Sequence, residues 1–149
     1  MATAEGPDDV WIASITAALL ARGRMIHGAA MGVTAATLVI ALLTGGVSAR
    51  LSLASLAAAA VFFCAALEFW LAARVAFDAE LFAALARRND LAGFDRAMTT
   101  LGLMKSGKTG RAMAERAQGA RRLLRMQALA FVALLVVAIG GWILIAWRL

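Results

Sequence analysis

The sequence predicts an all-α integral membrane protein with three transmembrane helices, an interfacial N-terminal helix and a basic cytoplasmic helical hairpin. Three observations predict this fold. Hydrophobic residues make up 63% of the 149 residues and charged residues only 16%, against about 45–50% and 25% in soluble domains. The apolar residues are concentrated in three runs of membrane-spanning length. The most highly charged stretch lies between the second and third of these runs. A soluble globule of this size could not bury so much apolar surface.

The N-terminal region, residues 1–24, begins as a tail and continues as a short amphipathic helix. Pro7 suits the first turn of a helix, and the two Asp side chains that follow it favour the positive end of the helix dipole. About a dozen residues are too few to span a bilayer. Two positions are open for this helix. It lies in the cytoplasmic interface with Trp11 near headgroup level, or it packs on the protein's own cytoplasmic helices.

Three apolar runs are each long enough to cross a hydrocarbon core of roughly 30 Å as a helix of about 20 residues. They must be helical there, because lipid offers the backbone no hydrogen-bond partners. The predicted transmembrane helices are residues 25–47, 51–73 and 126–147. Only His27 and Glu68 interrupt these runs with a basic or acidic side chain.

The distribution of Lys and Arg predicts how the chain is oriented. Residues 74–125 carry eleven Lys/Arg and five Asp/Glu, so their net charge of +6 equals that of the whole chain. The short loop between the first two runs carries only Arg50. Because Lys/Arg-rich loops stay in the cytoplasm, we expect a cytoplasmic N-terminus and a C-terminus on the periplasmic or outer side. The Ala/Arg/Gly-rich composition suggests a bacterial inner-membrane protein.

The basic region of residues 74–125 is predicted to be helical rather than a loose loop. No helix breaker occurs between about 51 and 88, or between about 111 and 147. Both helices should therefore extend out of the membrane and pair there as an antiparallel hairpin.

A short amphipathic helix is predicted over about 91–104, at the end of this hairpin. Asp90 is expected to cap it. Its apolar side includes Phe94 and Leu101, whereas Asp95 falls on the opposite, polar side.

Gly28, Gly32 and Ala36 fall on one face of the first transmembrane helix. Small residues at four-residue spacing let another helix approach closely. We therefore expect a helix-packing contact along this stripe. The sequence leaves open whether the contact is made within the chain or with a partner.

Glu68 and His27 are candidates for an intramembrane polar pair. Both lie a short distance inside the predicted cytoplasmic boundary, where a charged side chain is unfavourable and often functional. Glu68 could contact His27, Arg24 or Arg125. The pair could handle a proton or coordinate an ion. Alternatively, Glu68 reaches the interface or ties two helices together.

A basic cluster of Arg111, Arg121, Arg122 and Arg125 is expected to face the membrane lipids. Each Lys or Arg near an anionic bilayer surface contributes about 1 kcal/mol of attraction. Nucleic acid is not expected as a partner, because aromatic residues for stacking are few and no nucleic-acid-binding motif is present.

Residues Gly102 to Thr109 match the phosphate-loop pattern GxxxxGK[ST]. That mechanism also needs a buried strand before the loop and an acid to hold magnesium. The segment before this string is instead an amphipathic helix, so no nucleotide is expected. Whether the string binds any anion is left open.

The sequence offers no catalytic set, metal site or cofactor site. It contains one His and one Cys, whereas transition-metal sites usually take three or four ligands. We therefore expect a non-enzymatic multi-pass inner-membrane protein, an accessory or scaffold subunit that binds a membrane-protein partner or another copy of itself. The alternative is a small oligomeric transporter or channel with Glu68 and His27 near its pathway.

Overall fold

The protein is all helical over the residues that the computed structural model describes. These residues are 7–43, 53–88, 90–103 and 110–147. The elements are α1 (Pro7–Ala21), α2 (Gly23–Leu43), α3 (Leu53–Arg88), α4 (Leu91–Thr100) and α5 (Met113–Ala146). Three helical stretches are long and apolar enough to cross a membrane. The predicted all-α class and the three helices of spanning length are therefore confirmed.

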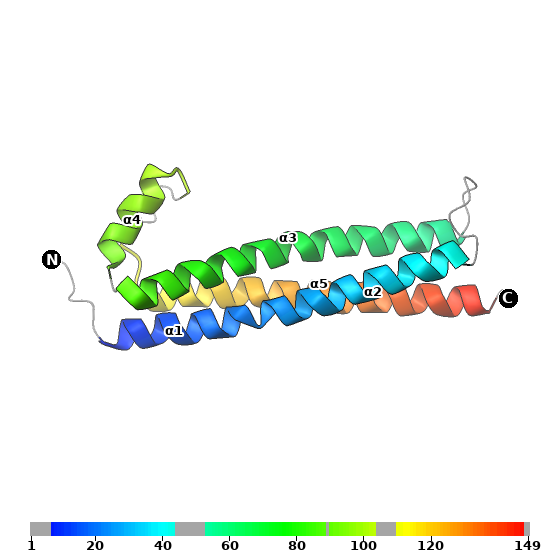
Figure 1. Ribbon diagram of the computed structural model, residues 1–149, viewed down its shortest axis with the longest axis horizontal. Helices are drawn as coiled ribbons and strands as arrows, with labels where there is room; N and C mark the ends of the chain where they lie inside the picture. Colours follow the sequence, from blue (N-terminus) through cyan, green and yellow to red (C-terminus); the bar gives the residue numbers. More distant parts are fainter. Residues whose placement is uncertain (1–6, 44–52, 89, 104–109, 148–149) are drawn as a thin grey trace.

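Three long rods lie side by side along the molecule (Figure 1). The first rod consists of α1 and α2, which follow one another nearly end to end; only Arg22 separates them. The second rod is α3, and the third is α5, which runs antiparallel to α3. Both α3 and α5 continue beyond the apolar runs without a break, as the lack of helix breakers predicted.

The N-terminal helix α1 packs against both α3 and α5. Ala13 and Leu20 of α1 are buried in one core with Val75 of α3 and Ala120 of α5. The structure thus shows the packing on the protein's own helices that the sequence left as one of two positions. The opposite side of α1 remains open, since Trp11 is 67% exposed. Its location at a membrane interface stays a prediction.

The bundle has two separate cores, one in each half of its length. We call the half built by α1, residues 74–88 of α3 and residues 113–124 of α5 the head, and the remainder of the three rods the span region. The head core comprises Ala13, Leu20, Val75, Ala79, Phe82, Leu85, Met113, Ala117 and Ala120. The span core comprises Ala30, Val61, Leu134 and Ala138. The head is therefore a three-helix arrangement rather than a two-helix hairpin alone.

Helix α4 lies at the head end of the molecule (Figure 1). Asp90 caps it as predicted, because its side chain accepts a hydrogen bond of 2.7 Å from the Gly93 amide. The predicted polar side was wrong for Asp95, which is only 8% exposed. Leu101, expected on the apolar side, is exposed. Asp95 is buried because it forms an ion pair with Arg116 of α5, while Leu91 and Phe94 of the apolar side pack against the head core.

Candidate functional site

A buried polar cluster joins the three rods where the head meets the span region. Glu68 of α3 is 1% exposed. Its Oε2 lies 2.9 Å from Nδ1 of His27 on α2. Its Oε1 accepts a hydrogen bond of 2.9 Å from Nε2 of Gln127 on α5. Both carboxylate oxygens are thus engaged, each by a different helix. The structure brings the predicted pair together and adds a third member that the sequence analysis missed.

Gln127 also fixes the junction between α1 and α2. Its Nε2 donates a second hydrogen bond, of 3.0 Å, to the carbonyl of Gly23, the first residue of α2. Its Oε1 is buried and has no hydrogen-bond partner in the described part of the chain. A Cβ at position 23 would lie 2.7 Å from this oxygen. Gly23 therefore leaves room for this oxygen, which a side chain at position 23 would displace.

His27 connects the buried cluster to the outer surface. Its side chain is 30% exposed, and its ring packs at a tilt against Phe69, with the ring centroids 5.7 Å apart. It lines a groove of about 140 Å³ between α2 and α3. The groove residues are Gly23, Arg24, His27, Phe69, Ala72, Ala73 and Ala76.

The cluster has two chemical capabilities. An ionised carboxylate without water needs a compensating charge or hydrogen bonds; a protonated His27 would supply the charge and Gln127 supplies a hydrogen bond. The contacts therefore tie three helices together. The same pair could also exchange a proton with the groove, because a His–carboxylate pair carries a proton on either member.

The three arginines that bound the apolar runs on this side lie at one level of the bundle. They are Arg24 of α2, Arg74 of α3 and Arg125 of α5. A Cβ at Gly23 would lie 2.8 Å from Cγ1 of Val75 and 3.4 Å from Cδ1 of Leu124. Gly23, Val75 and Leu124 are next to Arg24, Arg74 and Arg125 in the chain. The three arginines therefore lie at a similar position along the bundle axis. Arg74 also lies over the Trp70 ring, with Cζ 4.2 Å from its centroid, a pairing typical of a membrane–water interface.

The small-residue stripe of α2 faces outward from the other described helices. Gly28, Gly32 and Ala36 are all exposed. A Cβ added at either glycine would have nothing within 4 Å outside its own helix. The face of α2 that turns inward instead carries Gly23, Ala30, Thr37 and Ala41. The described residues therefore show no close helix contact at these two glycines, and a contact with a partner stays a prediction.

Three of the four predicted cluster arginines lie together on the outer side of α5. Arg121, Arg122 and Arg125 line an open groove of about 690 Å³ with Glu115, Gln118 and Gly119. Arg111 lies before α5 and is not part of this groove. Its carbonyl accepts a hydrogen bond of 3.1 Å from Nε of Arg116.

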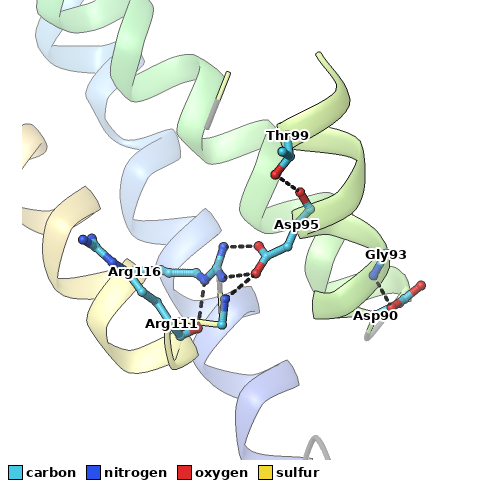
Figure 2. A network of polar contacts seen from close by, with 7 residues as sticks. Asp90, Gly93, Asp95, Thr99, Arg111 and Arg116 are labelled. Atoms are coloured by element: carbon cyan, nitrogen blue, oxygen red, sulfur yellow. Dashed lines mark hydrogen bonds and ion pairs between the residues drawn. The ribbon is translucent and has the colours of Figure 1, made fainter. Parts of the chain in front are cut away.

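A second polar site, which the sequence analysis missed, fastens α4 to α5 (Figure 2). The two terminal nitrogens of Arg116 lie 2.8 and 2.9 Å from the two carboxylate oxygens of Asp95. The amide of Gly110 donates a further bond of 2.8 Å to Oδ2. Burial acts to raise the pKa of Asp95, but the hydrogen bonds from Arg116 and Gly110 and the Arg116 charge outweigh it. The pKa is therefore below its ordinary value.

The phosphate-loop-like string falls largely outside the described residues, which do not include 104–109. Within the described ranges, no group of three or more His, Cys, Asp or Glu side chains could hold a metal ion. No protein-family model, curated protein or solved structure matches the chain.

Proposed function

We propose that this chain is a non-enzymatic, multi-pass protein of the bacterial inner membrane that serves as an accessory or scaffold subunit for another membrane protein. The observation that carries the proposal is the outward position of Gly28, Gly32 and Ala36 on α2. Small residues along an open helix face allow a partner helix to approach closely, with favourable backbone contacts. No described helix of this chain makes that close approach at Gly28 or Gly32, so the stripe is available to a second protein or a second copy.

The proposed membrane position follows from the common level of Arg24, Arg74 and Arg125. The outer surfaces of α3 and α5 change there from apolar to charged, which fits a single boundary plane between lipid and water. The Lys/Arg excess on the head side supports a cytoplasmic head and an outer C-terminus. A reporter fused after Leu149 is expected to be active only outside the cytoplasm. Activity confined to the cytoplasm would reverse the orientation.

The scaffold proposal is tested by Gly32→Leu, which covers the stripe at a position where an added Cβ has nothing within 4 Å among the described residues outside its own helix. Ala59→Leu is the matched control, because Ala59 is an exposed small residue on α3. Native mass spectrometry of the protein extracted in mild detergent should show a complex with a partner or a second copy. Gly32→Leu should reduce this complex to monomer, whereas Ala59→Leu should leave it intact. Wild-type protein that is only monomeric would contradict the proposal.

A second candidate function is a small oligomeric transporter or channel. The buried Glu68, held by His27 and Gln127, favours it, because ionisable groups at membrane depth often lie on substrate or proton pathways. Three helices enclose little space, so several copies would be needed. The test is flux in proteoliposomes that carry the wild type or Glu68→Gln. Flux that persists unchanged in Glu68→Gln would remove this cluster from the pathway.

A further inference from the structure

The groove between α2 and α3 combines apolar walls with two basic side chains. Ala72, Ala73 and Ala76 of α3 line it and leave space because their side chains are short. It extends from the level of Ala76 to that of Phe69, about 10 Å along α3 at 1.5 Å per residue. A volume of about 140 Å³ is below the 300–1,000 Å³ that encloses a drug-sized ligand. The groove therefore fits only one polar part of a larger molecule.

The two basic side chains of the groove are Arg24 and His27. His27 contacts Glu68 through Nδ1, so its other ring nitrogen faces away from that carboxylate. Glu68 itself is buried, is bonded to His27 and Gln127, and does not line the groove. The positive charge of Arg24 is thus presented to a ligand, while the negative charge of Glu68 is held behind His27. This arrangement favours an anion that also accepts hydrogen bonds.

The groove lies at the proposed boundary plane, because Arg24 is one of the three arginines that mark it. Met31 lies on the same side of α2, one turn further into the span region than His27. On α3, Phe62 lies two turns further into the span region than Phe69. Both side chains are exposed. This surface is therefore basic at the groove and apolar further along α2 and α3, toward the middle of the span region. A phospholipid has the same order, with a phosphate above and acyl chains below.

We propose that this groove is a binding site for the phosphate headgroup of an anionic phospholipid of the head-side leaflet. Arg24 and His27 contact the phosphate, Ala72 and Ala76 provide the space, and the acyl chains follow the apolar surface past Phe69. The site differs from the general basic surface of α5, because it lies between two helices and has a defined shape. The inference depends on the proposed membrane position but not on the proposed scaffold function.

The test uses delipidated full-length protein in detergent, with phosphatidylglycerol or phosphatidylcholine added back and counted by native mass spectrometry. The wild type should retain one phosphatidylglycerol in preference to phosphatidylcholine. Arg24→Gln should lower this retention at least about tenfold, the change expected for loss of a hydrogen bond to a charged group. Ala76→Leu should lower it by filling the groove from its rim, with Arg24 and His27 unchanged.

Matched controls are Arg87→Gln, at an exposed arginine near the end of α3, and Ala60→Leu, at an exposed alanine of the span region on the opposite side of α3 from Phe69. Both should retain phosphatidylglycerol as the wild type does. Equal retention of the two lipids, or full retention in Ala76→Leu, would overturn the proposal. Displacement of the lipid by inorganic phosphate would assign the site to a soluble anion and would also overturn it. Because the readout is made on the single chain, absence of a partner protein does not affect it.

Discussion

The head and the span region use the same three rods but have opposite arrangements of side chains. In the head, large apolar residues such as Phe82, Leu85 and Met113 are buried, and α5 turns Glu115 and Arg122 outward. In the span region the core comprises two alanines together with Val61 and Leu134, and many large apolar side chains point outward. Phe63, Leu129, Val132, Val136 and Ile143 are among the exposed ones. This inversion is expected where water surrounds one half and lipid surrounds the other.

The extent of burial supports the same comparison. In the most apolar window of each long helical stretch, only 17–28% of the residues are buried inside the protein. Most of the apolar surface of these stretches is therefore not buried inside this chain. Where the surrounding solvent is lipid, it does not have to be buried. The outer side of α1 departs from the pattern of the head, because Trp11, Ile15 and Leu19 are exposed. It is a second apolar surface available to the proposed partner or to the membrane interface.

The largest expected difference between the halves comes from matched Leu→Ala changes. Leu85 in the head and Leu134 in the span region are both buried. Leu85→Ala should lower the free energy of unfolding by about 2–5 kcal/mol, because it loses both transfer from water and packing. Leu134→Ala should lower the free energy of unfolding by only about 1–2 kcal/mol, because in lipid the change removes mainly packing contacts. Reversible unfolding in lipid bicelles measures both. Equal losses would mean that both halves face the same solvent.

The next effect is at the junction of the two halves. A Cβ at Gly23 would lie 2.7 Å from Oε1 of Gln127 and 2.8 Å from Cγ1 of Val75. Gly23→Ala should therefore destabilise the protein by about 1–3 kcal/mol through overpacking. Gly28→Ala is the control, with open space around the added methyl group, and should be neutral or slightly stabilising in unfolding experiments. A neutral Gly23→Ala would show that the junction is not closely packed.

A smaller effect is expected where α4 is fastened to the head. Asp95→Asn removes the ion pair with Arg116 and should weaken the docking of α4 by about 1–2 kcal/mol at neutral pH. Because the folded pKa of Asp95 is below 3.8, its contribution is complete above about pH 4–5 and is lost as the pH falls through the folded pKa. Hydrogen exchange of the α4 amides, corrected for intrinsic rates, measures both effects.

The control for this site is Glu80→Gln, at an exposed acid of α3, which should leave α4 exchange unchanged. In Asp95→Asn the additional exchange seen at low pH should disappear, because the titrating group is absent. If wild type and Asp95→Asn showed the same pH dependence, another group would control the docking of α4.

The smallest effect concerns the outer basic side of α5. Arg125 lies at the proposed boundary and Arg122 one turn beyond it, so each should contribute about 1 kcal/mol of preference for anionic lipid. Arg88 lies 14 residues beyond Arg74 on α3, about 21 Å from the boundary, which exceeds the screening length of about 8–10 Å. Electron paramagnetic resonance with spin-labelled phosphatidylglycerol should detect losses in Arg122→Gln and Arg125→Gln. A comparable loss in Arg88→Gln would argue against the proposed boundary.

The polar cluster shows where prediction from the sequence was limited. Glu68 and His27 were candidates because an ionisable residue stands out in an apolar run. Gln127 was missed because an uncharged amide at the start of such a run carries little signal. The only indication of its role was its position close to Arg125 at the start of an apolar run, which resembles the position of His27 close to Arg24. Likewise, Asp95 and Arg116 are 21 residues apart in separate helices, and no helical periodicity relates them.

The sequence by itself determined the helical class, the number of helices of spanning length and the absence of breaks in α3 and α5. Apolar run length, charge and helix-breaking residues are local properties, so they can be read along the chain. Only the tertiary structure decided which side of each helix turns inward. On α2, small residues occur on several sides, and Ala30 rather than Gly32 is buried. That choice depends on the shapes of α3 and α5 and on the contacts of Glu68 and Gln127, which no single helix contains.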